Sequence, residues 1–160
     1  MVSLNLQSPE ISNIDEFLAA AHRRRYPRGS TIIYAGEQSD SIYYITKGSV
    51  TVLIEDESGR EIIVAYLNEF DFFGEMGLFQ QGTRTAWCKA KIDCEVAELS
   101  YAKFNELSEK NSAMLFALTS QVVERLSKMT KKVGDLAFLD VTGRVARKLL
   151  DLSQEPDAMT

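Results

Sequence analysis

The sequence is poor in the residues that build metal sites, disulfide frameworks and fibrous structures. Its 160 residues include one histidine, two cysteines, three prolines and nine glycines. Zinc and non-haem iron sites need two or three His or Cys ligands at characteristic spacings, so we expect no metal site. So few glycines and prolines exclude a collagen-like or disordered polymer. The single His22 is followed by three arginines, so no catalytic Ser–His or Cys–His pair is credible and we expect no enzyme.

Long apolar runs and an excess of positive charge are missing as well. No run approaches the ~20 apolar residues that span a bilayer, and the N-terminal MVSLNLQSPE lacks the basic and apolar regions of a signal peptide. The 18 Lys and Arg residues against 23 Asp and Glu residues leave a net charge of -5, whereas a stand-alone nucleic-acid-binding protein is usually basic. We therefore expect a cytoplasmic globular protein that neither enters a membrane nor binds DNA tightly by itself.

The first two thirds of the chain change from a helical to an alternating pattern. Apolar residues recur at helical spacing over 12–21, which predicts a helix capped by Ser12 or Asn13. The basic run 22–25 then places cations at the C-terminal end of this helix. Over 31–99 the apolar residues alternate in short runs separated by turn residues, which predicts an antiparallel barrel or jelly roll.

The helical period returns near Tyr101, first in a short helix and then in a long one at 112–136. Apolar residues of the long helix are three or four positions apart, as in the seam of a two-stranded coiled coil. A small barrel cannot cover so long a stripe, so we expect a parallel homodimer through residues 112–136. The stripe consists of Leu115, Leu118, Val122, Leu126, Met129, Val133 and Leu136.

The last part of the chain has the pattern of a second folding unit. Asp140 can cap a further helix over 141–152, and residues 156–160 have the composition of a loop. We therefore expect a barrel domain at 1–111, a dimerisation helix at 112–137, and the start of a truncated domain at 138–160.

One segment between two predicted strands has features that suit a cyclic phosphate. Glycines, among them Gly74 and Gly77, flank a stretch with room for about one turn of helix, whose amides can face an anion. Arg84 supplies a planar and permanently charged group for phosphate, and Thr85 adds a hydroxyl and an amide. Glu75 can accept a hydrogen bond from a ribose hydroxyl. Turn glycines and a structural ion pair between Glu75 and Arg84 would give the same pattern, so these residues alone favour the phosphate interpretation only modestly.

Longer stretches match a known family. They include HRRRY at 22–26, GEMGLF at 74–79 and KVGDLAFLDVTGR at 132–144. With these segments the chain resembles the cyclic AMP receptor protein (catabolite activator) family over its whole length, and especially the virulence factor regulator branch of pseudomonads. The resemblance implies a mainly β fold with flanking helices: a cyclic-nucleotide-binding jelly-roll barrel followed by a long dimerisation helix. Further matching segments are 31–36, 47–50, 94–98 and 154–160; in the family a winged helix-turn-helix follows the last of these, which implies a chain truncated before that domain.

The resemblance also implies roles for the residues of the glycine-flanked segment, with cyclic AMP as the ligand. Gly74 and the amide near Thr85 would hold the cyclic phosphate, and Arg84 would be its ion-pair partner. Glu75 would accept a hydrogen bond from the ribose 2′-hydroxyl, and Met76 would line the pocket.

On the long helix, the resemblance implies that Arg125 tethers Glu75 and that Thr130 reaches the adenine amine from the other subunit. Met129 stands where the family usually has a threonine beside the adenine. Either the methionine fills the dimer seam and the lost contact is tolerated, which the retained Thr130 favours, or selectivity for adenine is relaxed, because a buried unpaired amine is costly. A ligand joined to the barrel and to the opposite helix could bias a conformational equilibrium and extend the helices towards a hinge. That hinge consists of Phe138, Leu139 and Asp140.

Partners and alternatives follow from the same resemblance. RNA polymerase and promoter DNA are the implied partners of the full-length protein. The basic run 22–25, together with Arg28 and Lys103, matches a polymerase-contacting patch of the family, and the acidic run 55–57 resembles another. Solvated charged surfaces are the alternative explanation of both. The alternative function is a regulator of the same fold that senses another ligand, such as cyclic di-GMP, or acts without one. A purely structural dimer module would show the same seam.

We expect Cys88 and Cys94 to be buried and inert.

Overall fold

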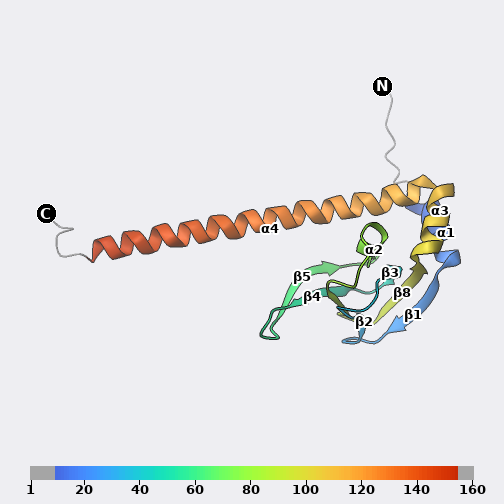
Figure 1. The fold of residues 1–160 in the computed structure, drawn as a ribbon, viewed down its shortest axis with the longest axis horizontal. Coiled ribbons are helices and arrows are strands. Elements are labelled where there is room, and N and C mark those ends of the chain that lie inside the picture. Colours follow the sequence, from blue (N-terminus) through green and yellow to red (C-terminus); the bar gives the residue numbers. More distant parts are fainter. Residues whose placement is uncertain (1–9, 155–160) are drawn as a thin grey trace, which may run out of the picture. The chain divides into compact units, whose positions relative to one another are not determined.

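A computed structural model describes residues 10–154 of the chain, with side chains from residue 14 (Figure 1). The chain divides into two compact units, of which the first ends at Thr119 and the second begins at Ser120. The long helix α4 (Ser112–Ser153) starts in the first unit and continues into the second. The loop predicted at 156–160 lies outside the described residues.

The strands of the first unit form two four-stranded sheets, in which every pairing is antiparallel. This arrangement confirms the predicted jelly-roll fold, and the short strands separated by tight turns explain why the alternating pattern was visible in the sequence. In spatial order, one sheet contains β1 (His22–Tyr26), β8 (Cys94–Ser100), β3 (Ser41–Lys47) and β6 (Phe72–Phe73). The other contains β2 (Thr31–Ile33), β7 (Trp87–Ala90), β4 (Val50–Glu55) and β5 (Glu61–Leu67).

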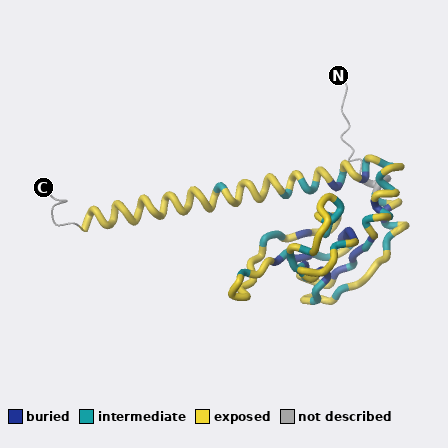
Figure 2. The backbone as a smooth tube through the Cα atoms, in the orientation of Figure 1, coloured by how far each residue is buried: buried dark blue, intermediate teal, exposed yellow. Residues whose placement is uncertain are grey.

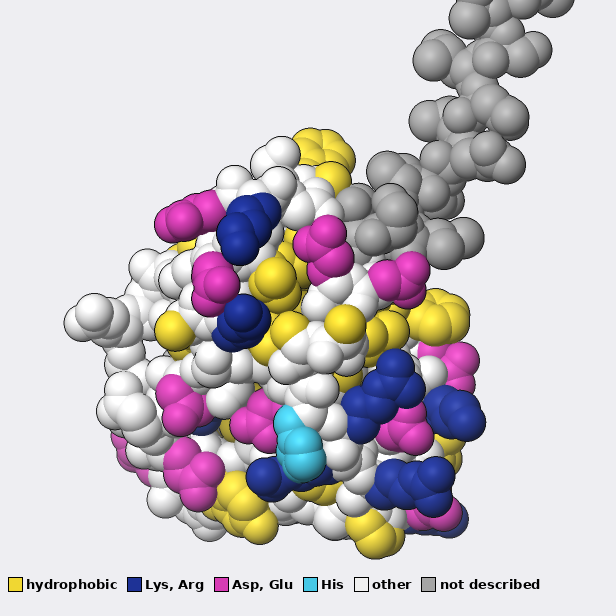
Figure 3. Space-filling model, turned by 90° about the vertical axis from the view of Figure 1, so that its right-hand side faces the viewer, with side chains coloured by type: hydrophobic (Ala, Val, Ile, Leu, Met, Phe, Trp, Pro, Cys, Tyr) yellow, Lys and Arg dark blue, Asp and Glu magenta, His cyan; other side chains and the backbone are white. Residues whose placement is uncertain are grey.

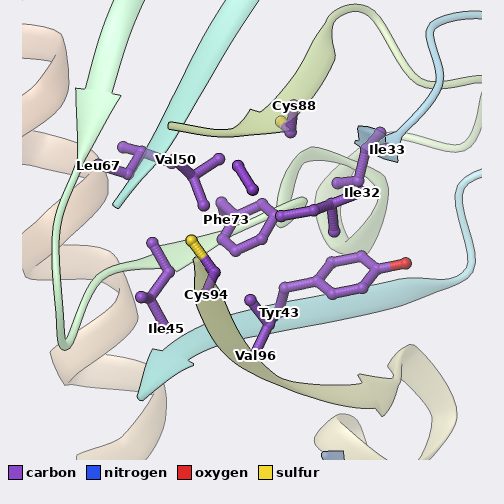
Figure 4. Close-up of a cluster of buried hydrophobic side chains, with 11 residues drawn as sticks. Ile32, Ile33, Tyr43, Ile45, Val50, Leu67, Phe73, Cys88, Cys94 and Val96 are labelled. Carbon is purple, nitrogen blue, oxygen red and sulfur yellow. The ribbon is translucent and has the colours of Figure 1, made fainter. Parts of the chain in front are cut away.

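The core of this unit is formed by apolar side chains from both sheets (Figure 4). Cys88 and Cys94 belong to it as free, buried cysteines, as predicted. Besides these two, the cluster contains Ile32, Ile33, Tyr43, Ile45, Val50, Leu67, Phe73, Ala90 and Val96.

Two helices, α1 (Glu10–Ala20) and α3 (Tyr101–Lys110), supply a second apolar cluster. The ring of Phe17, which is fully buried, lies 5.4 Å from that of Phe72, 6.0 Å from that of Tyr44 and 6.4 Å from that of Phe104. Because side chains alternate along a strand, the neighbours of Tyr44 and Phe72 belong to the core between the sheets instead. Helix α1 begins at Glu10, ahead of the predicted start near Ser12.

The prediction that the basic run 22–25 lies at the end of a helix is wrong. The run belongs to the edge strand β1. It pairs with β8, so that Arg24 lies opposite Val96. Its first four residues are all exposed, so they lack the alternation of apolar and polar residues by which a strand is recognised. Acidic residues of β8 balance the charge: Arg23 and Arg24 form ion pairs with Glu95 and Glu98 at 3.6 and 3.9 Å. Figure 3 shows basic and acidic side chains mixed on this face.

The helix boundary predicted near Asp140 is wrong, since α4 continues without a break from Ser112 to Ser153. The sequence has no proline in this range to stop the helix. Gly134 and Gly143 each cost a helix interior about 1 kcal/mol relative to alanine, which does not interrupt it. Instead of capping a new helix, Asp140 forms an ion pair with Arg144 one turn later, with Oδ2 of the aspartate 2.9 Å from Nη2 of the arginine.

The apolar stripe of α4 is used in two different ways. Met114 and Leu118 are buried, so Leu118 belongs to the packing of the barrel unit and not to a dimer seam. Beyond Thr119 the helix is mostly exposed (Figure 2), and Leu126 and Val133 are each 65% exposed. Among the described residues, no helix combines the length and the apolar composition that crossing a bilayer requires.

Candidate functional site

The segment predicted to bind phosphate connects the two sheets. It leaves β6 at Phe73, passes through Gly74 and Glu75, forms the single-turn helix α2 (Met76–Phe79) and returns through Arg84 to β7. The predicted single turn of helix is therefore present, and it includes Gly77. Glu75 lies at its N-cap position and is half-buried.

Both glycines of the segment are required by the backbone and its surroundings. Gly74 has φ +72°, a left-handed conformation that side chains disfavour, and a Cβ there would lie 2.9 Å from Nη1 of Arg84. A Cβ on Gly77 would lie 2.7 Å from the Tyr101 ring and would collide with Oγ of Ser39. The glycines thus let two side chains approach the α2 backbone closely.

The backbone of Arg84 is fixed to a neighbouring turn. Its N–H donates to the carbonyl of Glu37 at 2.7 Å, and its carbonyl accepts from the N–H of Gly36 at 2.8 Å. A further bond of 3.3 Å joins the N–H of Ser39 to the carbonyl of Gly82. These bonds set the position from which the arginine side chain extends.

The guanidinium group of Arg84 is held by acceptors from three parts of the chain. Nη1 donates to the carbonyl of Gly74 at 2.9 Å and to the hydroxyl of Tyr101 at 3.1 Å, and Nη2 donates to the carbonyl of Ser41 at 2.8 Å. The charged carbon also lies 5.5 Å from the ring centre of Tyr43, within the range of a cation–π contact. A half-buried guanidinium fixed in this way presents a positive charge next to the glycine-flanked turn, where it can bind an anion such as phosphate.

Tyr43 supports this site from β3. Burial raises the pKa of its hydroxyl well above the ordinary value, so the group stays protonated, and it donates to Oε1 of Glu98 at 3.3 Å. Neither this tyrosine nor Tyr101 was identified from the sequence as part of the site. No local pattern could have indicated either residue, because the sheet pairing brings them to Arg84 from distant positions in the chain.

The remaining predicted residues of the segment also lie together. The Thr85 hydroxyl donates to the sulfur of Met76 at 3.6 Å, and both side chains are exposed. The two ends of this segment of the first unit therefore lie side by side, since Arg84 contacts Gly74 and Thr85 contacts Met76. The predicted residues are Gly74, Glu75, Met76, Arg84 and Thr85.

The other predicted binding residues belong to the second unit. On α4, Nη2 of Arg125 donates to the side chain of Gln121 at 3.3 Å, and the Thr130 hydroxyl donates to the carbonyl of Leu126 at 2.9 Å. Met129 is 42% exposed. Within the described range 10–154 there is no group of three His, Cys, Asp or Glu side chains that could hold a metal ion.

Comparison with known proteins identifies the family. Residues 23–111 match the cyclic nucleotide-binding domain. The chain is 60% identical over 157 residues to the cAMP-activated global transcriptional regulator Vfr of Pseudomonas aeruginosa, and the match covers 96% of this chain and 73% of that protein. The chain belongs to the cyclic AMP receptor protein family.

Two further similar proteins extend the comparison. The cAMP-activated global transcriptional regulator CRP of Salmonella typhimurium is 53% identical over 148 residues, which covers 92% of this chain and 70% of that protein. The solved structure of CLP from Xanthomonas campestris, described as a c-di-GMP responsive global regulator, has a TM-score of 0.75 and 39% identity, covering 92% of this chain and 74% of that one. These matches confirm the predicted family, its fold, and a Vfr-like regulator with a cyclic nucleotide-binding domain.

Proposed function

We propose that this chain is the cyclic AMP-sensing and dimerisation part of a bacterial transcription regulator. The observation that carries the proposal is the guanidinium of Arg84, which three hydrogen bonds hold beside the glycine-flanked turn. The names of Vfr and CRP, which are cAMP-activated regulators, point to cyclic AMP as the ligand of such a site.

Each residue of the segment has a role in this proposal. Arg84 pairs with the cyclic phosphate, and Gly74 and Thr85 contribute the surrounding amides and a hydroxyl. Glu75 accepts a hydrogen bond from the ribose 2′-hydroxyl, which distinguishes a ribonucleotide from its deoxy form. Met76, whose side chain is 53% exposed, lines the pocket.

Helix α4 supplies the dimer and the switch. Its exposed stripe beyond Thr119 pairs with a second copy, Arg125 tethers Glu75, and Thr130 reaches the adenine of the partner's ligand. Binding then favours one of two dimer states and acts at a hinge. The proposed hinge residues are Phe138, Leu139 and Asp140. In the full-length protein this change controls the binding of promoter DNA and the contact with RNA polymerase in the cytoplasm.

A different ligand is the second candidate. The structure of CLP at 39% identity belongs to a c-di-GMP responsive regulator, so this fold is compatible with another nucleotide. Met129 gives a reason within this chain, because a thioether sulfur accepts a hydrogen bond from the adenine amine far more weakly than a threonine hydroxyl does. Cyclic di-GMP, or no ligand, is therefore the alternative.

Calorimetric titration with cyclic AMP, cyclic GMP and cyclic di-GMP separates these functions. We expect cyclic AMP to bind with micromolar or tighter affinity, with one molecule per barrel. Binding of cyclic di-GMP without binding of cyclic AMP would identify cyclic di-GMP as the ligand. If none of the three nucleotides binds, the chain is a dimerisation module that senses none of them.

The variant Arg84→Ala tests the site itself. We expect it to weaken cyclic AMP binding by about thirtyfold or more, because hydrogen bonds to a charged group are worth about 1.5–3 kcal/mol each. Arg60→Ala is the matched control, since Arg60 is exposed on the β4–β5 hairpin and pairs with Asp56. Thermal melting of both variants without ligand checks that the barrel is still folded. Affinity close to that of the wild type in folded Arg84→Ala would refute the site.

A further inference from the structure

The hydroxyl of Tyr101 lies at the centre of the hydrogen bonds behind the proposed phosphate site. It donates to the carbonyl of Gly74, and it accepts from Nη1 of Arg84 at 3.1 Å. The hydroxyl of Ser39 lies 2.6 Å away and completes the set as a donor. A tyrosine hydroxyl has one proton to donate and two lone pairs to accept with, so these three bonds satisfy it fully. The hydroxyl is therefore held in one orientation.

Tyr101 differs in kind from the other acceptors of the arginine. The hydrogen bonds from Arg84 to Gly74 and Ser41 end on backbone carbonyls, which are present whatever side chain stands at those positions. Among the acceptors described for this guanidinium, the Tyr101 hydroxyl is the one that belongs to a side chain. An arginine side chain otherwise loses rotamer freedom when a ligand orders it, which opposes binding. A side chain that orders the guanidinium in advance lowers this cost of binding.

The backbone and the ring of Tyr101 are also fixed. Tyr101 is the first residue of α3, and its N–H donates to the carbonyl of Asp40 at 2.9 Å. Ser100 caps the same helix by accepting from the N–H of Lys103 at 3.2 Å. Gly77 leaves the space that the ring occupies against α2. The guanidinium therefore has a fixed acceptor, and it leaves this position only by breaking its hydrogen bond to the Tyr101 hydroxyl.

We propose that Tyr101 is the positioning residue of the phosphate site: its hydroxyl holds the Arg84 guanidinium in the orientation that receives the phosphate and ties it to the start of α3. The inference rests on the proposed nucleotide-binding function. It adds that the affinity for the phosphate depends on a residue that does not touch the nucleotide. It also identifies the residue through which the arginine is joined to α3, the helix that leads into α4.

The test compares the affinities of Tyr101→Phe, Arg84→Lys and the double variant for cyclic AMP by calorimetry. Tyr101→Phe keeps the ring and removes only the hydroxyl, and we expect it to weaken binding by about tenfold, as one hydrogen bond to a charged group is lost. If the hydroxyl acts through the arginine, its removal adds less than about twofold in the Arg84→Lys background. Affinity within about twofold of the wild type, or losses that multiply in the double variant, would overturn the proposal.

A spectroscopic measurement separates positioning from a merely structural role. In the ligand-free protein, NMR of the arginine side chains should show slowed rotation of the Arg84 guanidinium in the wild type and faster averaging in Tyr101→Phe. Tyr66→Phe is the matched control, because Tyr66 is 55% exposed and its ring lies against Lys91. If the wild type binds no nucleotide, the proposed function fails, while the NMR comparison still decides whether Tyr101 orients the arginine. Equal rotation in both proteins would show that it does not.

Discussion

At the scale of single residues, Phe70 is in a conformation that its side chain opposes. Its φ is +73°, in the left-handed region, and its side chain is 64% exposed. The surrounding turn holds it there. The N–H of Phe70 donates to the carbonyl of Ile45 at 2.8 Å, and the N–H of Asp71 donates to the carbonyl of Asn68 at 3.1 Å. A residue with a Cβ pays about 1–2 kcal/mol in this region.

We expect Phe70→Gly to be more stable than Phe70→Ala by about 1 kcal/mol. Both variants remove the ring and its contact with Tyr44, so their difference reports the backbone conformation alone. Urea denaturation at neutral pH measures the two free energies of unfolding. Equal stability of the two variants would mean that the turn relaxes to a negative φ in solution.

At the scale of elements, the β4–β5 hairpin is closed by one carboxylate. Oδ1 of Asp56 accepts from the hydroxyl of Ser58 at 2.6 Å, from its N–H at 2.9 Å and from the N–H of Arg60 at 2.9 Å. Oδ2 accepts from Nε of Arg60 at 2.7 Å. The bond from the Ser58 hydroxyl, followed by that from the Arg60 amide, lowers the pKa of Asp56 to about 2.

This hairpin should therefore lose stability in acid. The folded carboxyl has a lower pKa than the unfolded one, so the unfolded chain binds the extra proton as the pH falls from about 4 to about 2. The contribution of Asp56 is fully present above this window and is lost through it. A carboxyl NMR titration should show Asp56 titrating near 2, and Asp56→Asn should remove its share of the acid dependence in urea denaturation. Glu57→Gln is the matched control, because it removes the same charge from the same turn. Titration of Asp56 near its ordinary value of 3.8 would contradict the hydrogen-bonded turn.

At the scale of the whole molecule, α4 leaves too much apolar surface exposed for a single chain. Leu126, Val133 and Leu136 are 65%, 65% and 67% exposed, and they follow one another along the stripe at intervals of seven and then three positions. Spacing of this kind matches the seam of a two-stranded coiled coil, in which a second copy covers the stripe. The proposed occupant is therefore another copy of this chain.

We expect the wild type to sediment as a dimer at micromolar concentration and Leu126→Glu to sediment as a monomer. Burying a carboxylate in each helix costs several kcal/mol, which raises the dissociation constant by about a hundredfold or more. Ser127→Glu is the control, because it adds the same charge to the neighbouring exposed position off the stripe. A monomeric wild type, or the same behaviour of both variants, would exclude this seam. Circular dichroism checks that both variants keep their helices.

Much of this architecture follows from local patterns in the sequence. Alternation over 31–99 predicted the strands from β2 onwards, the spacing after Tyr101 predicted α3 and the start of α4, and the glycine-rich segment after Phe73 predicted a single turn of helix, which is α2. These predictions hold because the apolar period of a strand or helix is set by its own geometry and the side of it that is buried. The phosphate segment is readable for a similar reason, since its glycines and Arg84 lie within a short stretch of chain.

Tertiary structure decided what no local pattern contains. The run 22–25 became a strand because pairing with β8 satisfies its backbone, although its exposed arginines show no alternation. Leu118 entered the barrel unit because a position on a helical stripe does not say which surface will cover it. Tyr43 and Tyr101 reached Arg84 through pairing between distant segments, which depends on the packing of the whole sheet. Local patterns thus predicted most of the elements, the family and the residues of the phosphate segment, whereas the fold alone decides what holds the arginine in place, because its partners come from distant parts of the chain.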